Sequence, residues 1–395
     1  MKSKIALILS LLIMLCSCNI LPKPPEKKEN SFSGGVWISY SEINRMLLSE
    51  EGFEAELEKA VKNCNNLHIE NVYIHVRPFC DSLYPSKIFP LNSNAKKYDY
   101  DIFEKMIEVF HQSFIKVHAW VNPYRVLTSS SNIEDVNAQS PAYKWLTDDE
   151  PENDLNVCIY NGIYLNPASE SVQKLVMDGI REIITNYNVD GIHFDDYFYP
   201  TKNEDFDKQS YEIYKNSSTN PLSLDDWRRQ NVNNLISGCY LAIKSLNDKI
   251  MFSVSPAASI QKNYADLYAD VEEWIVCGYI DTVIPQLYFG YNYSDENFRF
   301  DVLLEDWVAL CEKNEKVGLL VGLAFYKIGS YSEADTDEWQ TQTDIIARQV
   351  SQCYQNQRFS GYVAFSYSSL FSDESLNLKQ RNALLKIIGG ENKNE

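Results

Sequence analysis

Residues 190–200 read Asp-Gly-Ile-His-Phe-Asp-Asp-Tyr-Phe-Tyr-Pro, so that an apolar strand leads into two adjacent carboxylates and then into aromatic residues. Placing Asp195 and Asp196 at the end of a core strand costs free energy unless the carboxylates have a use. Paired carboxylates surrounded by aromatic side chains are typical of enzymes that cleave glycosidic bonds. Side chains alternate along a strand, which predicts His193, Asp195 and Tyr197 on one face and Asp196 on the other. The structural alternative is that Asp196 caps the next segment and Asp195 pairs with an arginine.

The elements that must position these residues alternate after residue 33, strand followed by helix, eight times. This alternation predicts a parallel sheet, and eight units are enough to close a (β/α)8 TIM barrel of the α/β class. An open doubly wound sheet is the alternative, but no glycine-rich phosphate-binding pattern follows the first strand. We expect the strands at 35–40, 71–79, 116–122, 191–195, 250–255, 282–288, 318–325 and 361–366. We expect the helices near 51–66, 101–114, 169–187, 225–246, 264–277, 300–313, 341–357 and 375–388.

The chain is longer than a minimal barrel, and the excess lies in residues 126–168, after strand three, and 198–224, after strand four. Both segments are polar and rich in tyrosine, and both follow the carboxyl ends of strands. Long loops at that end of a barrel usually build the walls of a substrate site. We therefore interpret residues 34–390 as one catalytic domain with two long loops.

Polar and aromatic residues follow nearly every predicted strand, and the carboxyl ends of parallel strands meet at one end of a barrel. A broad groove with aromatic platforms, hydrogen-bonding groups and few cations suits a sugar chain. Trp37 and Trp120 fit equally well as core residues or as stacking platforms for sugar rings. The expected substrate-binding residues are Arg77, His118, Asn122, Tyr124, Arg125, Tyr164, Asn166, His193, Tyr197, Gln286 and Tyr288.

Two catalytic arrangements fit the sequence. In the first, Asp195 is the nucleophile or base and a carboxylate from another strand is the acid, with Asp81 or Glu42 as candidates; the two groups would stand ~5–5.5 Å apart in a retaining enzyme and ~6.5–9.5 Å apart in an inverting one. In the second, the adjacent pair Asp195 and Asp196 does both jobs. One carboxylate orients an acetamido group of the substrate, whose oxygen attacks the anomeric carbon, while the other protonates the leaving oxygen.

The first residues predict an exported protein. Two lysines precede an apolar run at residues 5–15, which is too short to span a membrane and suits a secretory signal. The following Leu-Cys-Ser-Cys resembles the lipobox of bacterial lipoproteins, which implies removal of residues 1–17 and lipidation of Cys18. An ordinary signal peptide cut nearby is the alternative. Residues 18–33 are polar and rich in proline, so we expect a flexible tether that links an extracytoplasmic domain to a membrane.

The composition of the chain limits which classes of molecule it is expected to bind. The chain has 36 basic and 55 acidic residues and a formal net charge of −19, which argues against a nucleic-acid partner. The cysteines beyond the signal are scattered singly, and neither a C-x-x-C nor an H-E-x-x-H motif occurs. We therefore expect no metal and no cofactor, and a monomer whose partners are a polysaccharide and, through the anchor, a membrane.

Several motifs together resemble one known family, the glycosyl-hydrolase-like family ten of bacterial lipoproteins. These are Gly-Val-Trp-Ile-Ser-Tyr (35–40), Val-Arg-Pro-Phe-Cys-Asp-Ser-Leu-Tyr (76–84), His-Ala-Trp-Val-Asn-Pro-Tyr-Arg (118–125), Tyr-Leu-Asn-Pro (164–167), the 190–200 segment, Trp-Arg-Arg-Gln-Asn-Val (227–232), Phe-Ser-Val-Ser-Pro (252–256) and Pro-Gln-Leu-Tyr (285–288). The resemblance implies a (β/α)8 barrel. For at least some members it implies cleavage of peptidoglycan glycan strands that have lost their stem peptides.

Such denuded strands carry a free lactyl carboxylate on each muramic acid, and an acidic protein needs cations in its groove to hold them. Arg77 and Arg125 follow adjacent strands, and we expect at least one of them to bind this carboxylate. Alternatively, both pair with Asp195 or Asp81 and only hold the site together. Other readings of the whole chain are a non-catalytic carbohydrate-binding or peptidoglycan-binding barrel, a glycosidase for another polysaccharide, and a barrel enzyme of sugar-phosphate metabolism.

Overall fold

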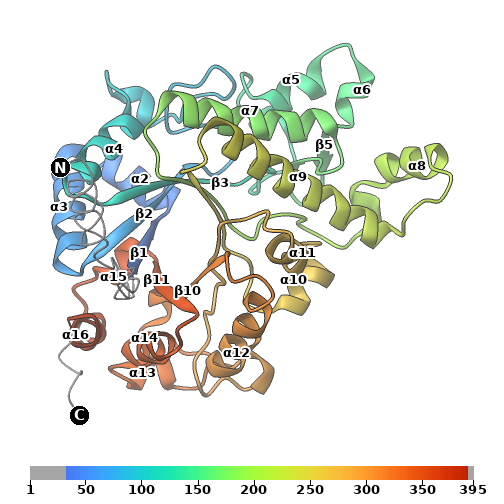
Figure 1. The fold of residues 1–395 in the computed structure, drawn as a ribbon. Coiled ribbons are helices and arrows are strands. Elements are labelled where there is room, and N and C mark those ends of the chain that lie inside the picture. Colours follow the sequence, from blue (N-terminus) through green and yellow to red (C-terminus); the bar gives the residue numbers. More distant parts are fainter. Residues whose placement is uncertain (1–32, 390–395) are drawn as a thin grey trace, which may run out of the picture. The chain divides into compact units, whose positions relative to one another are not determined.

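A computed structural model describes residues 33–389, in which eight parallel strands close a barrel and helices surround it (Figure 1). The strand order around the barrel is β1-β11-β10-β9-β8-β7-β3-β2, so the predicted (β/α)8 fold is confirmed. The strands are β1 (Ser33–Ile38), β2 (Ile69–Arg77), β3 (Lys116–Val121), β7 (Gly191–Phe194), β8 (Met251–Val254), β9 (Thr282–Val283), β10 (Gly318–Ala324) and β11 (Phe359–Phe365). The predicted signal (residues 1–17), the lipidation site Cys18 and nearly all of the predicted tether lie outside the described residues.

A helix occurs in every predicted segment, but two of these segments are divided, and two short helices at residues 40–47 and 367–370 were not predicted. Together these helices surround the barrel. They are α2 (Tyr40–Leu47), α3 (Phe53–Asn66), α4 (Ile102–Gln112), α7 (Glu170–Asn186), α9 (Leu224–Leu246), α10 (Ile260–Asp266), α11 (Val271–Val276), α12 (Phe300–Cys311), α13 (Glu338–Thr341), α14 (Ile345–Gln355), α15 (Tyr367–Leu370) and α16 (Ser375–Ile388). The segments 264–277 and 341–357 each hold parts of two helices instead of one. In the first, Tyr268 has a left-handed φ of 54°, and the carboxylate of Asp270 caps α11 by accepting a hydrogen bond from the backbone N–H of Glu273.

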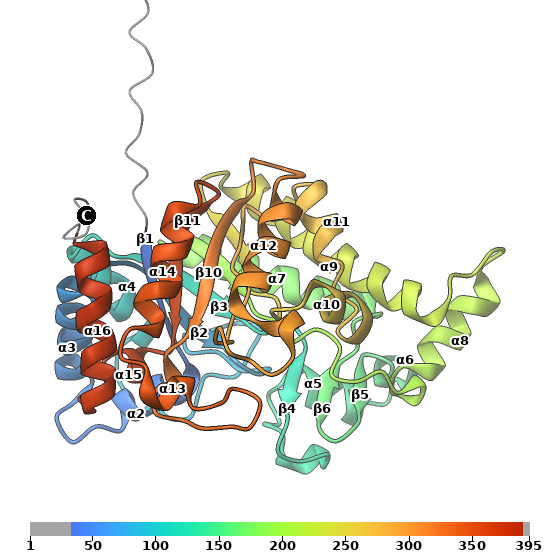
Figure 2. The ribbon, with the colours of Figure 1, turned by 90° about the horizontal axis from the view of Figure 1, so that it is seen from below.

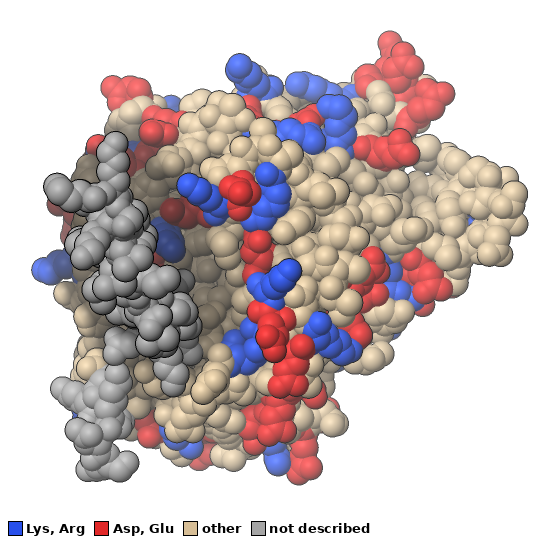
Figure 3. Space-filling view, in the orientation of Figure 1, with Lys and Arg blue, Asp and Glu red and all other residues tan. Residues whose placement is uncertain are grey.

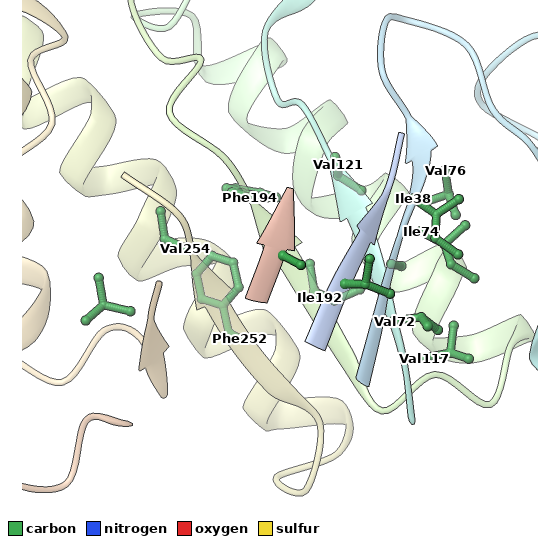
Figure 4. Packing of buried hydrophobic residues seen from close by; sticks show 14 of the residues in the cluster. Ile38, Val72, Ile74, Val76, Val117, Val121, Ile192, Phe194, Phe252 and Val254 are labelled. Atoms are coloured by element: carbon green, nitrogen blue, oxygen red, sulfur yellow. The ribbon is translucent and has the colours of Figure 1, made fainter. Parts of the chain in front are cut away.

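The alternation of side chains along the strands builds two separate apolar regions. Outward-facing residues such as Ile74, Val117 and Phe194 pack between the strands and the helices (Figure 4). Inward-facing residues fill the barrel itself, so that it is a packed core and not a channel. The inward cluster consists of Trp37, Tyr73, Trp120, Ile284, Leu320 and Val363.

The two predicted loops contain secondary structure of their own. The first holds α5 (Pro141–Thr147), α6 (Pro151–Asp154) and an antiparallel sheet of β4 (Arg125–Leu127), β6 (Ile163–Leu165) and β5 (Val157–Ile159). The second holds α8 (Lys208–Ser217), and the buried ion pair of Arg228 with Asp207 ties its base to α9. In Figure 2 the β4–β6 sheet lies at the end of the barrel opposite the start of β1. The first insertion therefore extends the carboxyl-terminal end of the barrel.

The described residues include no helix with the length and hydropathy of a membrane span. On the coloured part of the face in Figure 3, lysine and arginine side chains lie among aspartate and glutamate side chains in a band across the middle. Positive charge is therefore interrupted by negative charge on this face.

Candidate active site

A pocket of about 380 Å³ opens at the carboxyl-terminal end of the barrel. Its walls come from residues that end or follow the barrel strands, the position at which barrel enzymes carry their active sites. The pocket is lined by Trp37, Ser39, Tyr40, Ser41, His75, Trp120, Arg125, Asp195, Asp196, Tyr197, Ser255, Gln286, Tyr288, Tyr326 and Phe365. Six of the residues expected at the site therefore surround one cavity, namely Arg125, Asp195, Asp196, Tyr197, Gln286 and Tyr288.

Both carboxylates of the adjacent pair line this pocket, although strand alternation places them on opposite faces. The reason is that β7 ends at Phe194, so the alternation no longer applies one residue later. Asp195 is only 3% exposed. Its Oδ2 accepts a hydrogen bond of 3.0 Å from the indole N–H of Trp120, and its Oδ1 accepts one of 3.3 Å from the backbone N–H of Tyr197.

The surroundings of the pair favour its protonated form. Burial, and next the negative charge of Asp196, raises the pKa of Asp195 to about 8. Burial also raises the pKa of Asp196, and the side chain of Gln286 opposes this shift. Two carboxylates this close titrate as a unit, so the pair holds a proton at neutral pH. A carboxyl group that keeps its proton at neutral pH is what an acid catalyst of glycoside cleavage requires.

The two tryptophans form the floor of the pocket and belong to the barrel core. The indole N–H of Trp120 also lies 3.2 Å from Oδ1 of Asn122, so Asn122 supports the floor from behind and does not line the pocket. The indole N–H of Trp37 donates a 3.0 Å hydrogen bond to Nε2 of His193, whose Nδ1 lies 2.9 Å from Oγ of Ser253. His193 is 0% exposed and lies below the floor, so the expectation that it binds substrate is wrong.

Several polar atoms in the walls have no hydrogen-bond partner among the described residues. They include Oγ of Ser255 and Nε of Arg125. Buried polar groups are nearly always hydrogen-bonded in folded proteins, because leaving one unpaired costs about 1–3 kcal/mol. Groups that lack an internal partner and line a cavity are suited to bind a polar ligand there, such as the hydroxyl groups of a sugar.

Arg77 does not reach the pocket, contrary to expectation. The register of β2 against β3 shifts between His75 and Arg77, which turns the arginine outward. Its guanidinium lies 4.5 Å from the ring centroid of Phe89, and a Cβ added at Gly179 would come within 2.2 Å of its Nη1. The glycine in α7 therefore makes room for a buried arginine, which is 2% exposed.

His118 lies inside the barrel, but toward its other end. Its Nε2 lies 3.0 Å from Oδ1 of Asn71, whose amide donates to Ser33 at the start of β1. Its ring stacks on Tyr73 with 4.5 Å between the centroids. Burial lowers the pKa of His118 to about 4, so the ring is neutral at physiological pH. The expectation that His118 binds substrate is wrong. His118 lies near the start of β3, whereas the pocket lies at the carboxyl-terminal ends of the strands.

Three further expected binding residues belong to the framework of the first insertion. Tyr124 is 1% exposed and packs in the apolar layer outside the strands. Tyr164 pairs with Arg125 in the small sheet. Asn166 donates hydrogen bonds of 2.7 Å to the carbonyl of Leu155 and 2.8 Å to Oγ of Ser210, which links the two insertions. None of the three lines the pocket.

The two candidate partners for Asp195 from other strands lie elsewhere. Glu42 is the N3 residue of α2, and its Oε2 completes a capping box with Ser39. Its Oε1 accepts hydrogen bonds of 2.7 Å from the hydroxyl of Ser366 and the backbone N–H of Ser368, so it joins α2 to the segment after β11. Asp81 does not line the pocket; burial raises its pKa to about 6. The pocket therefore contains the adjacent pair without either candidate acid.

Besides the two tryptophans, seven residues that line the pocket are absent from the expected binding set: Ser39, Tyr40, Ser41, His75, Ser255, Tyr326 and Phe365. The inward orientation of His75 could have been predicted, because His75 lies two residues after the inward-facing Tyr73 on the same strand. Its ring stacks on Trp120 at a centroid distance of 3.6 Å. No group of three or more His, Cys, Asp or Glu residues that could hold a metal ion occurs within residues 33–389.

Comparisons with known proteins identify the family of this chain. The family described as Glycosyl hydrolase-like 10 matches residues 34–359. The chain is 30% identical to the glycosyl hydrolase YngK of Bacillus subtilis over 364 residues, covering 85% of this chain and 68% of the relative. It is 28% identical to the glycosyl hydrolase DigH of Escherichia coli K12 over 380 residues, covering 84% and 85%.

Among solved structures, the glycoside hydrolase domain of PgaB (BpsB) from Bordetella bronchiseptica has the same fold. Its TM-score is 0.61 at 13% identity, covering 90% of this chain and 99% of that domain. The predicted family is thus confirmed by a match over most of the chain. The protein belongs to the Glycosyl hydrolase-like 10 family and is a glycoside hydrolase.

Proposed function

We propose that this protein is an extracytoplasmic, lipid-anchored enzyme that cleaves peptidoglycan glycan strands lacking stem peptides. The observation that carries the proposal is the adjacent pair of the buried Asp195 and the half-buried Asp196 in an aromatic-lined pocket at the catalytic end of the barrel. A barrel that only bound carbohydrate would keep the aromatic walls but has no need for a buried carboxylate beside a second, half-buried one, because taking a carboxylate out of water costs free energy.

The chemistry that best fits this pocket uses the adjacent pair alone. The proton held by the pair is transferred to the oxygen of the leaving sugar, and the acetamido oxygen of the bound sugar attacks the anomeric carbon. The other carboxylate orients the acetamido N–H and stabilises its developing positive charge. Water then opens the resulting cyclic intermediate, and the first carboxylate, now without its proton, accepts one from that water. Peptidoglycan sugars carry the acetamido group that this route needs, and neither Glu42 nor Asp81 lines the pocket to act as a separate acid.

The walls supply what a sugar chain would use. Exposed aromatic rings flank the opening, with Tyr197 at 52% and Tyr326 at 46% exposure. The unpartnered hydroxyl of Ser255 is available for a sugar hydroxyl. Stacking on rings combined with a few fixed polar contacts is the usual way in which proteins hold carbohydrate.

The substrate test compares intact sacculi with glycan from which an amidase has removed the stem peptides, with products identified by mass. We expect soluble oligosaccharides from the stripped glycan and none from intact sacculi. Products from chitin oligomers alone would redirect the proposal to another acetamido polysaccharide. Binding of the stripped glycan without any product would instead indicate a binding barrel.

The anchor is tested separately. Changing Cys18 to Ser should abolish incorporation of labelled fatty acid and release the protein from the membrane fraction. Retention of label in this variant would show that the signal is cut and modified elsewhere. An unchanged membrane fraction without label would indicate a different mode of attachment.

A further inference from the structure

Arg125 is the only cationic side chain among the residues that line the pocket. It forms no ion pair and no hydrogen bond through its guanidinium with the described residues, and its Nε is buried without a partner. A guanidinium in contact with protein usually satisfies several of its five N–H donors. Its donors are therefore free for a group that enters the pocket.

The arginine is held in place by elements that do not use up those donors. Its backbone begins β4 and pairs with Tyr164 of β6 in the small sheet. Its guanidinium carbon lies 4.9 Å from the ring centroid of Phe79 and 4.3 Å from that of Tyr197. Contacts with ring faces hold a guanidinium through its plane and leave the N–H groups at its edge available.

The charges around Arg125 leave room for an anion. His75, beside it, is neutral because burial, and next the charge of Arg125 itself, lowers its pKa well below the ordinary value. Burial raises the pKa of both carboxyl groups, and the pair retains a proton at neutral pH, so it does not place two full negative charges beside Arg125. An acidic sugar entering such a pocket does not meet the repulsion that the net charge of the whole chain would suggest.

Resting on the proposed function, we infer that Arg125 forms a carboxylate subsite, which binds the acidic substituent of a sugar directly next to the scissile bond. A planar guanidinium matches a carboxylate through two parallel N–H···O contacts. The subsite would make the enzyme select carboxylate-bearing glycans over neutral acetamido polymers. It also replaces the alternative in which this arginine only pairs with Asp195 or Asp81, since no such ion pair forms among the described residues.

The test compares one glycan in two charge states. Stem-peptide-free peptidoglycan is used with its lactyl carboxylates free, and again after carbodiimide-mediated amidation has turned them into neutral amides. We expect wild-type kcat/KM to be at least tenfold higher on the acidic form. Arg125→Gln should remove that preference, with a loss of at least tenfold on the acidic form and less than threefold on the amidated form. Arg348→Gln, which changes an arginine that also contacts a tyrosine ring but lies outside the pocket, should keep the preference.

Loss of activity alone does not decide the matter, because Arg125 also influences the carboxylate pair, but that effect acts equally on both substrate forms. An equal loss on both forms, or no preference in the wild type, overturns the inference. Equilibrium binding of both forms is measured in parallel. Arg125-dependent preference in binding without any cleavage would support the subsite and refute the hydrolytic function; no preference in binding would overturn the subsite.

Discussion

Replacing Asp195 by Asn should make the protein more stable at pH 8 than the wild type, while hardly changing its stability at pH 5. The side chain is 3% exposed, and its pKa in the folded state is about 8. Asparagine has nearly the same shape as a protonated aspartic acid and carries no charge. The substitution therefore mimics the wild type at low pH and removes a buried charge at high pH.

The direction of this pH dependence of stability follows from proton linkage. Because the folded-state pKa is raised above the unfolded value, the folded state holds this proton more tightly than the unfolded chain does. The resulting stability is fully present below about pH 4 and is lost as the pH rises through about 8. Between pH 5 and pH 8 the wild type should lose up to about 4 kcal/mol, since each pH unit in this window corresponds to ~1.4 kcal/mol for one proton. The asparagine variant does not titrate here and avoids this loss.

The stability gained by Asp195→Asn at pH 8 should be smaller than this upper limit. Trp120 and the backbone of Tyr197 both donate hydrogen bonds to Asp195, and the amide of asparagine can accept only one of them. The unpaired donor costs about 1–2 kcal/mol at pH 8. We expect the stability difference between variant and wild type to grow by ~2–4 kcal/mol from pH 5 to pH 8, which for a domain of this size is ~3–5 °C in Tm.

The assay is thermal unfolding of both proteins at several pH values from 5 to 8. Asp205→Asn is the matched control, because this carboxylate is 75% exposed at the surface. A plot of Tm against pH for Asp205→Asn should run parallel to that of the wild type. A constant difference in Tm between Asp195→Asn and the wild type across the whole range would refute the reasoning, since it would mean that this carboxyl is ionised, or protonated, throughout.

Other variants test the chemistry and the packing. Asp196→Asn should lower kcat by about a thousandfold, as loss of an acid or orienting group does, whereas Asp81→Asn should change it by less than about tenfold in assays of reducing-end release; an inactive Asp81→Asn enzyme would restore the two-strand mechanism. Trp120→Phe removes a donor that stabilises the charged form of the pair, so the alkaline limb of the pH–kcat profile should move to higher pH; an unchanged limb would exclude this hydrogen bond as a determinant. Gly179→Ala should destabilise the fold by about 1–3 kcal/mol in denaturant titrations, because the new Cβ would come within 2.2 Å of a buried arginine nitrogen. Gly238→Ala, where the nearest atom is a flexible methionine sulfur at 3.1 Å, should cost less, and equal losses would contradict the packing argument.

The fold was predictable because its signal is repeated and local. Each strand is a short apolar run, and the buried face of α7, with Val172, Val176, Ile180 and Ile183, shows apolar residues at spacings of four and three. What the pattern could not show is structure within the polar insertions. The sheet of β4, β5 and β6 is made of three-residue strands, which are too short to leave a periodic pattern.

The site was predictable at the end of β7 and much less so elsewhere. Alternation assigns a face only to residues that remain in a regular strand, and a single shift of register changes the outcome. This is what happened at Arg77, where the register of β2 changes and the side chain turns toward α7. The prediction from alternation also failed for His118 and His193, but for a different reason. Both side chains face inward as predicted, yet their positions along the strands place them in the packed core below the pocket.

The end of β7 at Phe194 determines that both carboxylates of the adjacent pair line the pocket. Had the strand continued regularly past Phe194, Asp195 and Asp196 would face opposite sides of the barrel wall. Because it stops there, both carboxylates line one pocket, where burial and the charge of Asp196 raise the pKa of Asp195. The floor beneath them is rigid, since Trp120 and Trp37 are fixed by hydrogen bonds to Asp195 and His193. A proton is thus held at neutral pH by placement in a packed barrel, and the adjacent aromatic rings and Arg125 determine which sugar can reach it.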